Sequence, residues 1–200
     1  MNDKLTEIIF LLDRSGSMGG LEKDVIGGFN SFVENQCKLQ GDTVLTTVLF
    51  DDEYVVLWSG ADAKSIQLTE EEYYVRGLTA LLDAIGKTII DVGRRLSNTS
   101  DEQRPGKVIF VITTDGQENA SKEFSYEKVS ELIKHQQEKY SWEFIFMGAN
   151  IDVAEEAENI GIKSSDAYSF EATEIGMKEM YEVVCESVKQ IRADSPSDKG

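Results

Sequence analysis

Three short apolar runs, at residues 8–12, 108–113 and 144–147, constrain the fold of this chain most strongly. Their apolar residues are nearly continuous and do not alternate with polar ones. Strands that are buried on both faces of a parallel sheet have this pattern, because helices cover both sides. A fourth run, at 44–50, leads through the acidic residues 51–53 into residues 54–58, which predicts a hairpin that adds an antiparallel edge strand.

Helical patterns separate these runs. Apolar stripes recur over residues 25–37, 81–96, 129–133 and 177–191, and a shorter helix at 153–159 and a last strand at 167–170 fill the remaining gap. This order predicts an α/β fold with a doubly wound, mostly parallel six-stranded sheet, one antiparallel edge strand and helices on both faces. We expect residues 1–192 to form a single domain and residues 193–200 to be a disordered tail.

Charge and composition argue against several classes of function. The net charge is −17 and no basic stripe is visible, so we expect no nucleic-acid partner. The run at 8–12 is too short to cross a bilayer, which predicts no membrane insertion, and the first residues do not resemble a secretion signal, which predicts a cytoplasmic location. Cys37 and Cys185 fall inside helical patterns and are interpreted as core residues, because with His135 as the one histidine they are too few for a zinc site.

Oxygen-bearing side chains gather where predicted strands end. Asp13, Ser15 and Ser17 alternate in the loop after residues 8–12, and glycines around them permit tight curvature. Oxygen ligands are what a hard cation such as Mg²⁺ prefers, but one carboxylate and two hydroxyls are too few. Thr79 and Asp115 stand in two loops that such a sheet places at the same crevice, so they are the expected further ligands.

Each of these residues alone is better explained by local structure. Asp13, Ser15 and Thr79 suit helix caps, and Asp115-Gly116 suits a turn. Together, at three loops in the right order, they favour the metal interpretation. Two other acidic groups receive structural interpretations: residues 70–72 as a solvated helix start, and residues 51–53 as hairpin turn residues. His135 is expected to be exposed.

The motif Asp13-x-Ser15-x-Ser17-Met18, then Thr79 before Ala-Leu-Leu-Asp-Ala-Ile, then Thr-Thr-Asp115-Gly, resembles the von Willebrand factor type A domain with its metal-ion-dependent adhesion site. The resemblance extends from about residue 5 to residue 191 and is closest to the bacterial, intracellular members. It implies that Ser15 and Ser17 bind the metal directly, that Thr79 binds directly or through water depending on state, and that Asp13 and Asp115 bind directly or through water. Leu78 departs from the small residue that many relatives have there.

The resemblance also implies a function. Mg²⁺, with Mn²⁺ or Ca²⁺ as alternatives, keeps one coordination position open for a Glu or Asp of a partner protein, which predicts a non-enzymatic, metal-dependent protein-binding module. The last helix slides in some relatives, and the Met-containing stripe at 177–191 would permit this. The rim that contacts the partner is expected to comprise Met18, Gly19, Gly20, Leu78, Gln117, Glu118, Asn119 and Ala120.

Two other functions remain open. One is a Mg²⁺-dependent phosphoryl hydrolase in which Asp13 or a metal-bound water attacks. Such enzymes usually need a second acid two residues after the nucleophile, and this chain has Ser15 there. The other is a subunit of a larger assembly in which the metal has a purely structural role.

Overall fold

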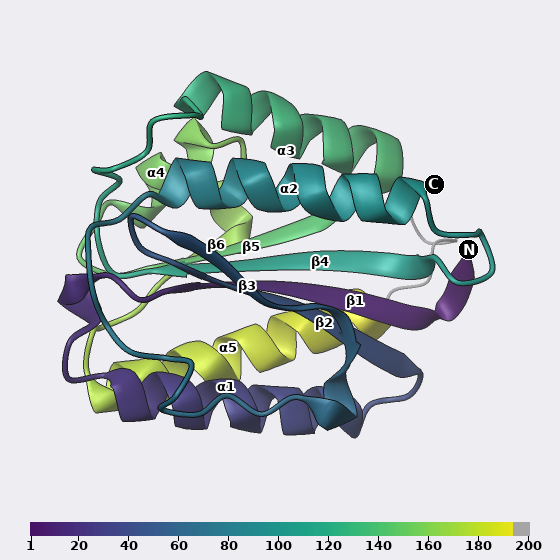
Figure 1. Ribbon diagram of the computed structural model, residues 1–200, viewed down its shortest axis with the longest axis horizontal. Helices are drawn as coiled ribbons and strands as arrows, with labels where there is room; N and C mark the ends of the chain where they lie inside the picture. Colours follow the sequence, from purple (N-terminus) through teal and green to yellow (C-terminus); the bar gives the residue numbers. More distant parts are fainter. Residues whose placement is uncertain (194–200) are drawn as a thin grey trace.

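In the computed structural model, which describes residues 1–193, one sheet has the strand order β3-β2-β1-β4-β5-β6 (Figure 1). Strand β3 pairs antiparallel with β2, and the other four pairs are parallel, so the predicted fold class is confirmed. The strands are β1 Asn2–Asp13, β2 Asp42–Phe50, β3 Tyr54–Asp62, β4 Pro105–Thr114, β5 Glu143–Gly148 and β6 Ala167–Ser169.

Helices cover both faces of the sheet, as Figure 1 shows. Helices α1 (Glu22–Cys37) and α5 (Glu174–Ala193) pack on one face. Helices α2 (Leu81–Ser97), α3 (Tyr126–Tyr140) and α4 (Val153–Asn159) pack on the other. Three single-turn 3₁₀ helices lie at Gly16–Met18, Ala63–Ser65 and Ser164–Asp166.

The two-sided core explains why the apolar runs are continuous. Along β1, Ile8, Phe10 and Leu12 contribute to the core under α1 and α5. Ile9 and Leu11 point the other way, into the core under α2, α3 and α4. Each of these five side chains is at most 1% exposed. Burying a side chain of this size stabilises the fold by about 1.5–3 kcal/mol, so an apolar residue is favoured at every position from 8 to 12.

Some boundaries differ from prediction. Strand β1 begins six residues earlier than the apolar run, and β3 continues to Asp62. Residues 70–72 do not start a helix: they belong to a turn in which the Thr69 amide and hydroxyl both donate to Glu72 Oε2, at 2.9 and 2.5 Å. Of the expected tail, Ala193 is the last residue of α5, and residues 194–200 lie outside the described part of the chain.

The predictions for the two cysteines, for His135 and for membrane-spanning helices can also be compared with the structure. Cys37 and Cys185 are free thiols, but they are half-buried at the margin of the core under α1 and α5. His135 is exposed on α3, as expected. No helix within residues 1–193 has the length and apolar character needed to cross a membrane.

The two edges of the sheet differ in construction. At one edge, the pairing of β3 with β2 shifts register on both sides of Thr47, and Gly60 has φ +62°. At the other edge, β6 contains three residues. Both edges are therefore irregular or short.

Candidate metal site

Three loops meet at the carboxyl ends of β1 and β4. The two strands are parallel neighbours with Leu12 opposite Thr113, so Asp13 and Asp115 leave the sheet side by side. The segment before α2 joins them, since the Gly16 amide donates to the Gly77 carbonyl oxygen at 3.2 Å. The loops that the sequence indicated as a metal site are therefore adjacent.

A short chain of polar contacts links the first loop to the third. The hydroxyl oxygens of Ser15 and Ser17 lie 3.1 Å apart. The Ser17 hydroxyl donates to Asp115 Oδ1 at 2.6 Å, across 98 residues of sequence. Three of the five predicted ligands thus lie within one hydrogen-bonded group.

Asp13 lies beneath this group and is fully buried. Its Oδ1 accepts the Ser15 amide N–H at 2.7 Å, and its Oδ2 accepts the Thr114 hydroxyl at 2.7 Å. Burial raises the pKa of Asp13 to about 6, the nearby Asp115 adds to this rise, and the hydrogen bonds from Ser15 and Thr114 oppose it. A cation bound here would offset the free-energy cost of keeping this buried carboxylate charged.

Asp115 is 2% exposed, and its second oxygen, Oδ2, is buried with no hydrogen-bond partner. Burial raises the pKa of Asp115, and the Ser17 hydroxyl opposes the rise. A buried carboxylate oxygen without a partner is uncommon, because desolvation is costly unless a donor or a metal compensates it. The donor set therefore fits a hard cation.

Thr79 joins the group from the second loop. A Cβ atom at Gly116 would lie 3.4 Å from Ser17 Oγ and 3.5 Å from Thr79 Oγ1, so the glycine keeps the space beside both hydroxyls open. Asn119 holds the Thr79 backbone on both sides: its Oδ1 accepts the Thr79 backbone N–H at 2.9 Å, and its own backbone N–H donates to the Thr79 carbonyl at 3.0 Å. All five predicted ligands thus border one small region.

Comparison with protein families gives a match over most of the chain. The model of the von Willebrand factor type A (VWA) domain matches residues 7–183. The chain belongs to this family. The resemblance that the Asp13, Thr79 and Asp115 motifs indicated is therefore confirmed.

Solved structures agree on the fold. Proximal thread matrix protein 1 from the mussel byssus, in a structure with a zinc-occupied MIDAS motif, has a TM-score of 0.64 at 18% identity, over 92% of this chain and 45% of that one. The ArnB paralog VWA2 from Sulfolobus acidocaldarius has a TM-score of 0.58 at 16% identity, over 93% of this chain and 45% of that one. This chain thus spans less than half the length of either. No curated protein matches the sequence.

Two residues of the predicted partner-binding rim, Met18 and Glu118, have other roles in the structure of this VWA domain. Met18 is 3% exposed and packs in the core under α1 and α5, so its side chain does not belong to an exposed rim. The Glu118 carboxylate accepts the amides of Leu82, Ala120 and Ser121 at 2.7–2.9 Å, which makes it a brace of the loop. The other predicted rim residues include Leu78, which is 57% exposed, and the exposed Gly19, Gly20, Gln117 and Asn119 beside the half-buried Ala120.

A second brace supports the same loop. Asp83, in the first turn of α2, accepts the amides of Lys122, Glu123 and Phe124 at 2.9–3.0 Å. Burial alone would raise the pKa of Asp83, but these three N–H donors outweigh burial and lower it. Helix α2 and the loop after Asp115 therefore fix each other.

Sequence reasoning missed the buried supports of the first loop. The Tyr73 hydroxyl donates to the Asp13 carbonyl at 2.7 Å, and the side chain is 1% exposed. Asp51, interpreted as a turn residue, is fully buried and pairs with Arg14 at 2.9 Å and Arg76 at 3.3 Å. Thr114, which donates to Asp13, stands beside Asp115 in the sequence motif and could have been found there. The contacts of Tyr73 and Asp51 join residues that are 25 to 60 positions apart, and no local sequence pattern indicates them.

The metal region differs from a carboxylate-rich or thiolate-rich centre. Within residues 1–193, no group of three or more His, Cys, Asp or Glu side chains is placed to hold a metal. The five predicted ligands comprise two carboxylates and three hydroxyls instead. Its ligand set is therefore mostly neutral.

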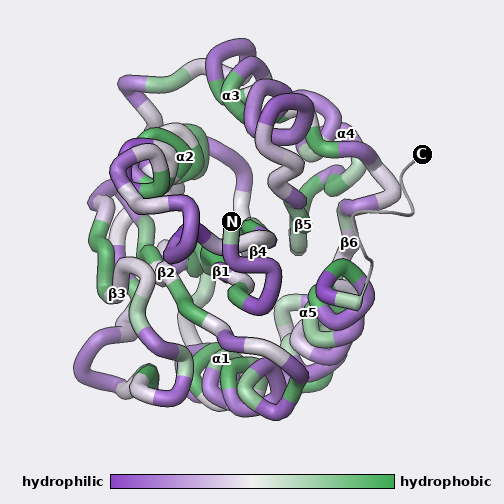
Figure 2. Tube along the Cα trace, turned by 90° about the vertical axis from the view of Figure 1, so that its right-hand side faces the viewer, coloured by the Kyte–Doolittle hydropathy of each residue, from purple (hydrophilic) through white to green (hydrophobic). Residues whose placement is uncertain are grey.

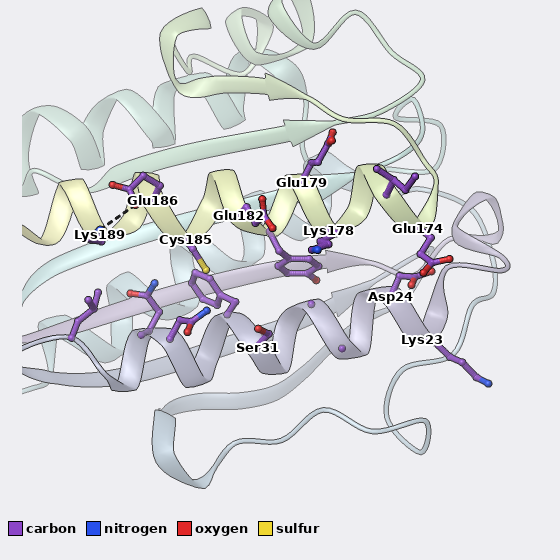
Figure 3. A pocket seen from close by; sticks show the side chains of 18 residues that line it. Lys23, Asp24, Ser31, Glu174, Lys178, Glu179, Glu182, Cys185, Glu186 and Lys189 are labelled. Atoms are coloured by element: carbon purple, nitrogen blue, oxygen red, sulfur yellow. Dashed lines mark hydrogen bonds and ion pairs between the residues drawn. The ribbon is translucent and has the colours of Figure 1, made fainter.

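A groove with a volume of about 980 Å³ lies away from these loops, between α1 and α5 (Figure 3). Figure 3 shows carboxylates and lysines mixed along α5, for example Glu182 beside Lys178, and Lys23 and Asp24 in the first turn of α1. Helices α1 and α5 are in close contact where Gly28 meets the Tyr181 ring, since a Cβ at Gly28 would lie 2.1 Å from Tyr181 Cδ2. Its mixed charge favours no particular class of ligand.

Proposed function

We propose that this VWA domain, residues 1–192, is a metal-dependent protein-binding module. Asp13, Ser15, Ser17, Thr79 and Asp115 would hold a Mg²⁺ ion, and a Glu or Asp side chain of a partner protein would complete its coordination. The observation that carries the proposal is the buried, unpartnered Asp115 Oδ2 beside Ser17 and above the buried Asp13.

The ligand chemistry supports a small hard cation. Carboxylate and hydroxyl oxygens suit Mg²⁺, and Mn²⁺ or Ca²⁺ would accept the same atoms at different distances. Three of the five proposed ligands are neutral hydroxyls, and a mostly neutral ligand set leaves the cation under-neutralised. The bound ion would therefore attract an external carboxylate. The zinc-occupied MIDAS motif of the mussel protein supports a divalent metal in this fold.

The surroundings of Asp13 favour binding over hydrolysis. Both carboxylate oxygens of Asp13 are engaged, one by the Ser15 amide and one by the Thr114 hydroxyl, and the side chain is fully buried. A nucleophile must reach its substrate, and solvent does not reach this carboxylate in this structure. The hydrolase alternative would then depend on a metal-bound water.

The electrostatic effect on an acidic partner differs between long range and contact distance. The net charge of −17 repels an acidic partner at long range, but salt screens this repulsion beyond about 8–10 Å. The metal acts at contact distance. The binding rate should therefore increase with ionic strength, while the metal determines whether the complex forms.

The first experiment is a calorimetric titration of the full chain with Mg²⁺, Mn²⁺ and Ca²⁺. We expect one site, weakened at least about tenfold in Asp115→Asn and in Ser17→Ala. Matched controls are Asp3→Asn, an exposed carboxylate at the opposite end of β1, and Ser59→Ala, exposed on β3. Unchanged affinity in both site variants would refute the metal site.

The second experiment tests the function. Proteins retained by the immobilised chain in Mg²⁺ should be released by EDTA and should not bind Ser15→Ala. Retention that resists chelation would count against metal-dependent binding. A parallel assay with p-nitrophenyl phosphate and Mg²⁺ should show no turnover, and turnover that is lost in Asp13→Asn would favour the hydrolase instead.

A further inference from the structure

A second groove lies at the opposite end of the sheet from the metal loops. It has a volume of about 530 Å³ and lies between the C-terminal halves of α2 and α3, over the first residues of β4. Figure 2 views the molecule from this end, with the N-terminus in front and α2 and α3 above it. Nothing in the proposed metal-dependent function uses this surface.

The walls of the groove are two helical stripes. Ile90, Arg94 and Ser97 follow one another on α2, and Leu132, His135 and Lys139 on α3, each set spanning two turns or about 10 Å. Two helix faces that border a groove of this length suit a third helix, which lays its apolar side between them.

The floor contains the side chains of Trp142 and Gln136. Trp142 is 5% exposed at the base of the groove. Gly93 leaves space above it: a Cβ there would lie 4.0 Å from the Trp142 ring and 3.9 Å from Gln136 Nε2. An added side chain is therefore tolerated by the fold but would project into the groove.

The rim exposes apolar side chains. Ile90 is 37% exposed and Tyr140 is 54% exposed, both on the groove. Apolar residues gathered at a groove mark interaction sites more often than scattered ones do. Here they flank the same opening from both helices.

The charge of the groove is opposite to that of the chain. Arg94, Arg104 and Lys139 line it with a single carboxylate, Asp3, whereas the whole sequence has 20 basic and 37 acidic residues. Arg104 is occupied, because its Nε and Nη2 donate to the carbonyls of Leu96 and Thr99. The more exposed cations of the groove are Arg94, whose side chain is 71% exposed and lies 4.0 Å from the Asp91 carboxylate, and Lys139, which is exposed beside the Tyr140 ring.

Helix-end electrostatics explains only part of this arrangement. Cations in the last turn of a helix stabilise its partial negative charge, which accounts for a basic residue at the end of each helix. It does not account for the exposed Ile90 and Tyr140 or for the open space at Gly93. Apolar surface together with positive charge points to an occupant that is apolar on one side and acidic at its margins.

We propose that this groove binds a short amphipathic helix of a partner protein, with apolar residues on Trp142 and Gly93 and acidic residues near Arg94 and Lys139. This docking is independent of the metal. The α1/α5 groove is larger, but its mixed carboxylates and lysines select no such partner, which makes it a suitable site for control substitutions.

The probe is a fluorescently labelled helical peptide of about 14 residues, with Leu at i, i+3, i+4 and i+7 and Glu on both flanks. Its binding to the full chain is followed by anisotropy, beside a scrambled peptide and one with Lys in place of Glu. We expect the acidic amphipathic peptide to bind at least about tenfold more tightly than both, with the same affinity in EDTA.

Substitutions locate the binding. Arg94→Glu with Lys139→Glu, and separately Gly93→Leu, should each weaken the peptide at least about tenfold while leaving the circular dichroism spectrum and Mg²⁺ affinity unchanged. Lys23→Glu with Lys178→Glu makes the same change in net charge within the α1/α5 groove and should have little effect. Equal weakening by both charge reversals, or equal binding of the scrambled peptide, would overturn the proposal. Self-association of the chain that Arg94→Glu with Lys139→Glu abolishes would also overturn it, since a second copy would then be the occupant.

Discussion

Replacing Asp13 by Asn should stabilise the metal-free protein and abolish metal binding together. The fully buried carboxylate is charged at neutral pH, although burial and the neighbouring Asp115 disfavour that charge. An amide has the same shape. Its oxygen still accepts the Ser15 amide, and its NH₂ group can donate to the Thr114 hydroxyl, which in turn donates to the Gly116 carbonyl at 3.1 Å.

The magnitude follows from the pKa of Asp13, raised from 3.8 to about 6. Because the folded state holds this proton more tightly than the unfolded chain, ionisation at pH 7.5 costs about 3 kcal/mol of stability. The buried amide keeps part of the desolvation cost, so we expect Asp13→Asn to gain about 2 kcal/mol in EDTA. For a chain of this size that gain corresponds to about 4–8 °C in Tm.

Thermal and urea unfolding, in EDTA and in Mg²⁺, measure this effect. In EDTA the wild type should become more stable as pH falls from 7 to 5, while Asp13→Asn should lack this rise. In Mg²⁺ at a hundred times its Kd, the wild type gains about 2.7 kcal/mol and the order reverses. Asp3→Asn should behave as wild type throughout. A less stable Asp13→Asn protein in EDTA, or one that Mg²⁺ still stabilises, would refute the reasoning.

Three further outcomes are expected. Mg²⁺ affinity, measured by calorimetry, should fall by up to about tenfold per pH unit below pH 6, because the ion must displace the Asp13 proton. Equal affinity at pH 7 and pH 5 would contradict this. Gly28→Ala should lose about 2 kcal/mol in urea unfolding, because its Cβ would overlap the Tyr181 ring, whereas Gly27→Ala, with no atom within 4 Å of its Cβ, should lose none. Asp83→Asn should lower the free energy of unfolding by about 1–3 kcal/mol and weaken Mg²⁺ binding, because three loop amides lose a charged acceptor. Normal metal affinity in the folded variant would show that the loop keeps its conformation without the Asp83 carboxylate.

The order of strands and helices could be predicted because burial acts on every residue of an element. Within β1, Ile9 and Phe10 face different cores, so every residue from 8 to 12 is apolar, and that pattern is local. The start of β1 at Asn2 could not be predicted, because its first residues are exposed and polar and pair with β4 through backbone bonds. The expected helix start at residues 70–72 was wrong because Thr69 and Glu72 close a turn instead.

The metal loops could be found because parallel strands end at a common edge, and oxygen-bearing residues stood after two such strands, β1 and β4, and just before α2. The supports of those loops could not. Asp51 stands in a run of three acidic residues, and nothing local distinguishes it from the exposed Asp52 beside it. Its burial depends on Arg14 and Arg76, which come from other loops. Long-range ion pairs of this kind leave no periodic trace in a sequence.

The irregular margins of the sheet also bear on how the molecule behaves at high concentration. A free strand edge is a template on which another chain can add by backbone hydrogen bonding, and growth of this kind leads to fibrils. Here the three residues of β6 give an incoming strand little to pair with, and the register shifts around Thr47 and the left-handed Gly60 twist the β3 margin. High protein concentration should therefore not drive this protein to polymerise through the edges of its sheet. Contacts with other molecules would then involve its loops and helices.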